Sequence, residues 1–261
     1  MNSKYIMIAN VIVSSIILTF ILLPILVMIF TVSGDKLLET MKDSEVMNSI
    51  YLSLSAAVTA SIIVLIFGTP FAYFLSRHEF FGKSIIESVI DLPIMIPHTV
   101  VGISLLSVIG KNFWFGRFLY NIGIRLLGNF WGIVLVMAYM GLPFYLNTVK
   151  VAMDKIPIRY EKISQSLGAN AFNTFKDVIL PLTKKAIITG FILAAARGIS
   201  EFGAVVIIAY YPATAPVLIY QRFTSFGLDY AKPIAVILLL VCLLIFFALR
   251  FLVRNKDAYS R

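Results

Sequence analysis

The sequence has few charged residues and a single cysteine, and each shortage excludes a class of protein. Asp, Glu, Lys and Arg make up only 13% of the 261 residues, whereas soluble domains carry about 25%. Hydrophobic residues make up 60%, and a single water-soluble core cannot bury so large a fraction. Cys242 has no cysteine partner for an intrachain disulfide. His98 has no second His, Cys or carboxylate at ligand spacing, so no metal site is expected.

Catalytic and nucleic-acid-binding motifs are also missing. The sequence contains no GxxxxGK[ST] phosphate-binding loop, no GxSxG nucleophile elbow and no HExxH motif. The net charge is +9, but the Lys and Arg residues stand in short stretches between apolar runs rather than in a basic patch with exposed aromatics. We therefore expect no catalytic residue, no enzymatic activity and no nucleic-acid partner. The charge pattern is typical of membrane topology instead.

Long apolar runs predict an all-α polytopic membrane protein with about six transmembrane helices, each needing about 20 residues, in one transmembrane domain over 1–261. The runs are 5–32, 47–75, 89–109, 130–151, 186–211 and 233–252. The first run is too long for the apolar part of a signal peptide, so it is expected to remain as a helix. Pro93 and Pro97 interrupt the start of the third run, where we expect a kink or a break.

The distribution of Lys and Arg in the connections predicts the orientation. If both termini lie inside, the inner segments hold twice as many of these residues as the outer segments. The positive-inside rule therefore places both termini in the cytoplasm. The connection 111–129 would lie outside, and it combines Phe113 and Trp114 with Lys111 and Arg125. This mixture predicts a segment in the headgroup region of the bilayer, with docking of an external partner as the alternative.

The longest connection, 152–185, is predicted to be a cytoplasmic helical hairpin. A first helix over 159–167 has one apolar and one charged face. Gly168 stops it, and a second short helix over 171–179 ends at Leu180 and Pro181. The apolar positions at helical spacing are Tyr160, Ile163 and Leu167, then Phe172, Phe175 and Ile179. Such a hairpin either docks a cytoplasmic partner or folds back onto the ends of its own membrane helices.

The same connection resembles the EAA signature of permease subunits of type I ABC importers. That signature has a glutamate, a glycine seven residues on and a Leu-Pro pair about a dozen further, as at Glu161, Gly168 and Leu180 with Pro181. The resemblance implies a coupling helix seated in a groove of a separate ATP-hydrolysing subunit. The implied ATPase-coupling residues are Glu161, Ile163, Leu167, Gly168, Ala169, Leu180 and Pro181. Glu-Lys-Ile replaces Glu-Ala-Ala at 161–163, so the detailed fit to that partner stays open.

Two further stretches, 91–106 and 190–206, are similar to helices of permeases for molybdate, tungstate and sulfate, and the family-like core covers 49–252. The resemblance implies a permease for a tetrahedral oxyanion in a prokaryotic cell membrane, with molybdate or tungstate favoured over sulfate or thiosulfate. It also implies a homodimer, two cytoplasmic ATPase subunits and an external solute-binding protein. No cofactor is expected in this chain, because ATP would be used by the partner ATPase.

Two opposite charges stand inside the fifth apolar run. Arg197 and Glu201 are four residues apart, so they share one helix face. Counted from Ala186, Arg197 lies about 16 Å along the helix, near the bilayer centre. An unpaired charge at that depth costs about 2.5–3.5 kcal/mol, so the pair must face protein or a water-filled cavity. It either lines the translocation pathway or forms a structural ion pair between helices.

Asp91 and His98 flank the proline-interrupted start of the third run. Asp91 is expected in the first turn of a helix, where the helix dipole favours a carboxylate. His98 is expected as a satisfied interfacial histidine. The rival function is a secondary transporter or channel in which Arg197, Glu201 and Asp91 form an ion relay. The cytoplasmic hairpin argues against this rival, which has no need of an ATPase-docking element.

Overall fold

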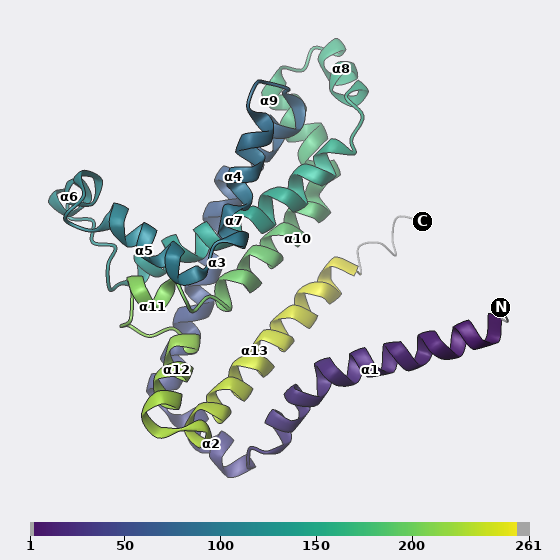
Figure 1. Ribbon diagram of the computed structural model, residues 1–261. Coiled ribbons are helices and arrows are strands. Elements are labelled where there is room, and N and C mark those ends of the chain that lie inside the picture. Colours follow the sequence, from purple (N-terminus) through teal and green to yellow (C-terminus); the bar gives the residue numbers. More distant parts are fainter. Residues whose placement is uncertain (1–2, 255–261) are drawn as a thin grey trace.

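The computed structural model describes residues 3–254, and every regular element in that range is a helix (Figure 1). The long helices are α1 (Ser3–Phe30), α3 (Ser44–Arg77), α7 (Phe130–Asp154), α10 (Leu180–Ile199) and α13 (Leu228–Arg254). The shorter ones are α2 (Gly34–Lys42), α4 (Lys83–Met95), α5 (His98–Ile109), α6 (Trp114–Asn121), α8 (Arg159–Ser166), α9 (Ala171–Thr174), the π-helical turn η1 (Phe175–Ile179), α11 (Val205–Ile208) and α12 (Ala215–Phe226). The predicted all-α fold is confirmed. The predicted cytoplasmic ends and the full 1–261 domain extend beyond the described residues on both sides.

Within residues 3–254, five helices are long and apolar enough to cross a membrane, and a bent pair can supply a sixth span. The five are Tyr5–Phe30, Ser44–Arg77, Phe130–Asp154, Ala171–Ile199 and Leu228–Phe247. The pair is α4 and α5, and the chain bends by 113° between them. Ile96 between them is extended, because the ring of Pro97 disfavours a helical residue before it. The prediction of about six spans is confirmed, and so is the break in the third.

The core lies where α3, α7 and α10 pack side by side (Figure 1). Small residues let these backbones approach closely. A Cβ added at Gly141 of α7 would lie 3.1 Å from the carbonyl oxygen of Ala194 in α10. One added at Gly198 of α10 would lie 3.3 Å from the Cβ of Ala57 in α3. Because lipid is as apolar as the side chains, such close van der Waals packing is what holds membrane helices together.

Helix α1 stands apart from this three-helix frame, whereas α12 and α13 pack together beside it (Figure 1). The most apolar 18-residue stretch of α1 contains no buried residue. Phe20 and Phe30 are 79% and 81% exposed. An apolar helix with so few contacts needs lipid or a second polypeptide around it. Either the bilayer or another chain therefore covers α1 in the assembled protein.

The fifth span differs from the sequence prediction at both ends. A short helix over 171–179 and a span over 186–211 were expected, but one helix runs from Ala171 to Ile199. Pro181 does not end the hairpin helix as predicted. It lacks an N–H for the carbonyl of residue 177, and the wider turn η1 directly before α10 makes room for its ring. Because α10 stops at Ile199, Arg197 lies in its last turn rather than in mid-helix.

Candidate functional site

The connection 152–185 projects from the bundle as a helical hairpin built from α8 and α9 (Figure 1). Gly168, between the two helices, has a φ of +92°, which residues with side chains rarely adopt. No atom lies within 4 Å of the position of an added Cβ, so the turn needs glycine for its backbone conformation and not for space. Asn170 then caps α9, because its side-chain oxygen accepts a 2.8 Å hydrogen bond from the N–H of Asn173. The predicted order of helix, glycine and helix is present.

Three apolar side chains of this hairpin are exposed, whereas those of Phe175 and Ile179 pack into the bundle. Ile163 is 56% exposed, Leu167 84% and Phe172 69%. We call these three residues the hairpin tip. Single exposed apolar residues are ordinary, but several gathered on one projecting element are typical of a protein interface. The described chain leaves the tip uncovered, so the alternative that it folds back onto its own membrane helices does not hold for these three side chains.

Glu161 points the other way, into the bundle, and is only 7% exposed. Its carboxylate pairs with the Nε–H of Arg77 at the end of α3 and accepts a 2.6 Å hydrogen bond from the hydroxyl of Tyr73. Arg77 also donates to the carbonyl oxygens of Met153 at 3.0 Å and Ile156 at 3.2 Å. One guanidinium thus ties α8 to α3 and to the end of α7. These buried, charge-assisted contacts anchor the helix that carries the hairpin tip.

A second buried charge cluster lies where α10 ends. The Glu201 side chain is fully buried, and its carboxylate accepts hydrogen bonds from Arg197 Nη2 at 2.7 Å and from the backbone N–H of Ala204 at 2.9 Å. Nη2 of Arg197 also lies 2.9 Å from Nε2 of His98. The ring of His98 reaches Glu201 as well, with 3.4 Å between Nδ1 and the carboxylate. We call Arg197, Glu201 and His98 the intramembrane triad.

The intramembrane triad lies where two broken spans meet. His98 begins α5 directly after the break at Pro97, and Glu201 lies in the break between α10 and α11. A Cβ added at Gly203 would lie 2.9 Å from the Cβ of His98, so the two segments touch. Transporters place substrate and ion sites at such discontinuities. The triad closes this junction while the His98 side chain remains 43% exposed, so the geometry accommodates both a structural and a pathway role.

Residues 65–257 match the family described as the binding-protein-dependent transport system inner membrane component. This chain belongs to that family. The permease family predicted from the EAA-like pattern is thereby confirmed. Among the relatives, the molybdate/tungstate transport system permease protein WtpB of Methanocaldococcus jannaschii is 44% identical over 91% of this chain and 92% of the relative. WtpB of Pyrococcus furiosus is 39% identical over 92% of each chain. The sulfate transport system permease protein CysT of Salmonella typhimurium is 31% identical over 81% of this chain and 78% of the relative.

This inner membrane component also shares its fold with solved ABC transporters. A bacterial ABC transporter involved in the import of the acidic polysaccharide alginate matches with a TM-score of 0.75, over 99% of this chain and 96% of that chain. The MetNI methionine ABC transporter matches with a TM-score of 0.62, over 80% of this chain and 95% of that chain. The sequence identities are 14% and 16%. At such identities the likeness establishes the fold alone.

Within this inner membrane component, the predicted coupling residues do not form a single surface. Exposed on the hairpin are Ile163, Leu167 and Gly168. Partly or fully buried are Ala169, Leu180 and Glu161. Pro181 is exposed, but it lies inside the continuous helix and not in the hairpin turn. Residues of one sequence signature therefore divide into a group that faces outward and a group that fixes the hairpin to the bundle.

Three partners in these sites escaped the sequence analysis. Arg77 and Tyr73 were not singled out there, because they lie 84 and 88 residues from Glu161. His98 was expected only as a satisfied histidine, although its place after a helix-breaking proline is a usable signal. The expectation for Asp91 was wrong. It lies well inside α4 and accepts a 2.7 Å hydrogen bond from the Asn147 amide of α7.

Proposed function

We propose that this chain is the permease subunit of an ATP-driven importer for molybdate or tungstate. The observation that carries the proposal is the hairpin, whose exposed apolar tip is held from a buried Arg77–Glu161 pair. A cytoplasmic ATPase subunit can bind an apolar element that is anchored and uncovered in this way. Relatives named for molybdate/tungstate transport are 37–44% identical over more than nine-tenths of the chain, which supports that substrate class ahead of sulfate.

The proposed assembly contains two copies of this chain, two ATPase subunits and an external solute-binding protein. The uncovered helix α1 supports a second copy, because it offers an apolar surface along its whole length. Two copies would present two hairpins to two ATPase subunits. The lack of a phosphate-binding loop in the sequence supports hydrolysis in those separate subunits. The binding protein would deliver the anion from outside.

One continuous helix links the hairpin to the intramembrane triad. The helix over 171–199 begins in the hairpin and carries Arg197 in its last turn. At 1.5 Å per residue these points lie about 39 Å apart. When the ATPase pair closes and moves the hairpins, the far end of α10 moves with them. The break after Ile199 and the segment packed on His98 then shift, which rocks the helices between inward-open and outward-open states.

The intramembrane triad is proposed as part of the pathway wall and not as a tight anion site. Glu201 offsets the charge of Arg197 at 2.7 Å, so an arriving oxyanion meets little net positive charge. A conduit must release what it admits. Affinity for the anion would therefore reside mainly in the solute-binding protein. Through their contacts with His98, Arg197 and Glu201 would hold the two broken spans together during transport.

Transport by reconstituted protein tests the proposal directly. The chain in proteoliposomes with its ATPase and binding protein should accumulate labelled molybdate or tungstate only when ATP is supplied. Excess sulfate should compete weakly. Gly168→Val forces a side chain into a backbone conformation at φ +92°, at a cost of about 1–2 kcal/mol. It should therefore displace α8 and reduce either capture of the ATPase or the coupling of hydrolysis to transport.

Gly123→Val is the matched control for this variant. Gly123 has a φ of +86° and also has no atom within 4 Å of an added Cβ, but it lies in the connection between α6 and α7. It should introduce comparable strain and leave ATPase capture unchanged. Uptake by the chain alone, driven by a proton or sodium gradient and indifferent to Gly168→Val, would refute the importer and favour a secondary transporter.

The proposed orientation has both termini and the hairpin in the cytoplasm of a multi-pass protein of the prokaryotic cell membrane. Ser166 and Thr224 are both exposed, the first on α8 and the second on α12. In a Cys242→Ser background, Ser166→Cys should be protected from an impermeant thiol reagent added outside intact cells, and Thr224→Cys should react. Labelling of Ser166→Cys but not of Thr224→Cys would show that the orientation is opposite to the proposed one.

A further inference from the structure

The connection between α5 and α7 forms an arm with exposed aromatic side chains at the end of α7 opposite the hairpin. Its helix α6 projects beyond α5 (Figure 1). Trp114 is 70% exposed and Phe118 54%. Aromatic rings are enriched at the headgroup level of a bilayer, where one part of the ring is apolar and the other is wet. The arm is therefore suited to lie against the membrane surface.

Two cations of this arm converge on one aromatic ring without a carboxylate beside them. Lys111 Nζ lies 3.9 Å from the ring centroid of Tyr120, and Arg125 Cζ lies 5.2 Å from the same centroid. The sequence contains no Asp or Glu between Asp91 and Asp154. Neither Lys111 nor Arg125 takes part in any of the ion pairs among residues 3–254. Two neighbouring positive charges without a counter-ion favour an anionic ligand.

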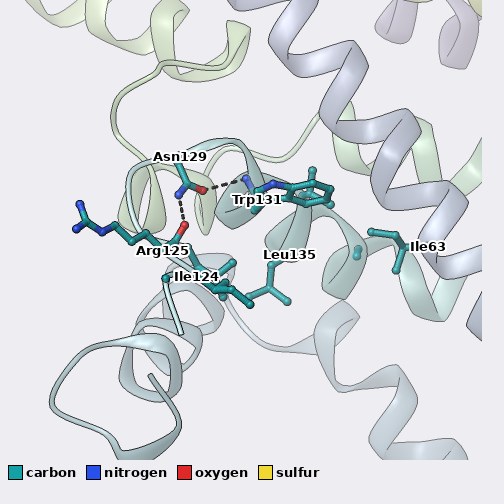
Figure 2. Close-up of a pocket in the computed structure, with 10 residues that line it drawn as sticks. Ile63, Ile124, Arg125, Asn129, Trp131 and Leu135 are labelled. Carbon is teal, nitrogen blue, oxygen red and sulfur yellow. Dashed lines mark hydrogen bonds between the residues drawn. The ribbon is translucent and has the colours of Figure 1, made fainter. Parts of the chain in front are cut away.

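An apolar groove of about 630 Å³ is lined at one edge by Arg125, and its volume falls within the range of about 300–1,000 Å³ that holds small ligands. Figure 2 shows Ile124 and Leu135 around the hollow, with Ile63 of α3 on its far side and the Arg125 side chain directed away from them. Asn129 fixes this edge, because its amide binds the carbonyl of Arg125 and its oxygen caps the start of α7. The groove is thus apolar inside, and Arg125 extends from its edge toward Tyr120, whose ring Lys111 also contacts.

We propose that this groove binds one anionic phospholipid. The phosphate of the headgroup lies between Lys111 and Arg125, and an acyl chain lies along Ile63 and Leu135. Both the charge at the rim and the apolar lining fit an amphipathic anion. An acidic protein surface would satisfy the cations but leave the groove empty. A helix from a second copy would fill the groove but leave the cations without a counter-ion.

The test measures retention of lipid by the purified full-length chain with native mass spectrometry. The probes are phosphatidylglycerol and phosphatidylcholine with identical acyl chains, so only the headgroup charge differs. The wild type should bind one phosphatidylglycerol in preference to phosphatidylcholine. Each cation near a membrane surface strengthens anionic-lipid binding about five-fold, so Lys111→Gln with Arg125→Gln should weaken it about 25-fold. Ala138→Phe, which fills the groove, should weaken binding of both lipids.

Lys36→Gln with Lys42→Gln is the matched control, because it removes two exposed positive charges from α2 instead. It should leave the preference for phosphatidylglycerol intact. Inorganic phosphate that displaces the lipid at millimolar concentration would indicate a simple anion site and overturn the proposal. Loss of affinity for the solute-binding protein in the Lys111 and Arg125 variant, without loss of lipid, would assign the arm to protein docking. A disulfide formed between Ala138→Cys and a cysteine on α1 of a second copy would assign the groove to the dimer.

Discussion

Two buried Arg–Glu pairs lie near opposite ends of the helix over 171–199 and have different structural roles. Arg77 and Glu161 are 84 residues apart in sequence and join α3 to α8. Arg197 and Glu201 are only four residues apart and flank the end of α10. In the first pair, Arg77 also donates hydrogen bonds to two backbone carbonyls. In the second pair, Glu201 also accepts a hydrogen bond from the N–H of Ala204. One pair positions a loop on a frame, whereas the other stabilises an interruption in a helix.

Burial separates the pairs further. The Glu201 side chain has no exposed surface, whereas that of Glu161 keeps 9%; their arginine partners Arg197 and Arg77 keep 15% and 8%. The first pair also lies where the chain leaves the membrane, and the second lies between two interrupted spans. Because stranding a charge is most unfavourable where water cannot reach it, equal substitutions in the two pairs should have unequal effects. The predictions below test this difference.

The largest effect is expected for Arg197→Met. It leaves the fully buried Glu201 carboxylate with only the partly exposed His98 and one N–H, so the folded state should lose about 3–5 kcal/mol. Adding Glu201→Leu should restore much of that loss, because no charge is then stranded. Folded yield in detergent and midpoints of denaturant unfolding measure both variants. Arg117→Met, at an exposed position on α6, is the neutral control. A double variant as damaged as the two single changes added together would show that the residues do not act as a pair.

Arg77→Met should have a smaller and more local effect. It leaves Glu161 with the Tyr73 hydroxyl near the membrane surface, at a cost of about 2–3 kcal/mol, since an unsatisfied buried group costs about 1–3 kcal/mol and more when charged. Hydrogen exchange should rise in 155–175 while the exchange of α3 and α7 stays slow. Arg77→Lys keeps the charge but loses the forked geometry, so it should recover only part of the protection. Equal increases across all spans would contradict a local anchor.

Tyr73→Phe removes one 2.6 Å hydrogen bond to Glu161 and leaves the ion pair in place. A hydrogen bond to a charged group contributes about 1.5–3 kcal/mol, and the low end is expected because Arg77 still neutralises the carboxylate. Exchange in the hairpin should increase less than in Arg77→Met. Tyr145→Phe loses a hydroxyl that is hydrogen-bonded to Thr69 and should leave the hairpin unaffected. A larger effect of Tyr73→Phe than of Arg77→Met would reverse the proposed roles.

His98→Gln is expected to be the mildest change, at about 1 kcal/mol or less, because the side chain is 43% exposed. Glu201 keeps Arg197 and the N–H of Ala204, and the amide of glutamine can replace one contact of the imidazole. Transport rate should be altered more than the unfolding midpoint, since His98 faces the junction between the broken spans. Unfolding damage as large as that of Arg197→Met would mean that His98 is an essential part of the buried pair.

The sequence predicts local features well and distant partners poorly. The apolar runs mark the spans, the prolines mark the break in the third, and the spacing of Ile163 and Leu167 marks the hairpin helix. Each of these signals is contained in fewer than about 30 consecutive residues, within the reach of helical periodicity. The direction in which Glu161 points depends on Arg77, which packing brings near from another helix. Periodicity carries no information about that contact.

The fifth span was misread for a related reason. Hydropathy continues through residues 200–211, so a run of apolar residues looks like one helix. The chain leaves the helix at Ser200, and just beyond that point the Glu201 carboxylate accepts a hydrogen bond from the N–H of Ala204. Such a side-chain bond to the backbone competes with helical hydrogen bonding. At the other end, Pro181 was taken as a stop because sequence alone does not reveal the π-helical turn before it.

The π-helical turn over Phe175–Ile179 also sets the phase between the hairpin and the membrane. A π turn holds one residue more than the α-helical turn it replaces, and each residue of an α-helix rotates the chain by about 100°. Deletion of one residue in this turn would restore ordinary helical winding but rotate α9, directly before it, relative to α10. Phe172 would then face a different direction from Ile163 and Leu167, while the spans kept their packing. The orientation of the exposed hairpin is thus encoded by a count of residues as much as by their identity.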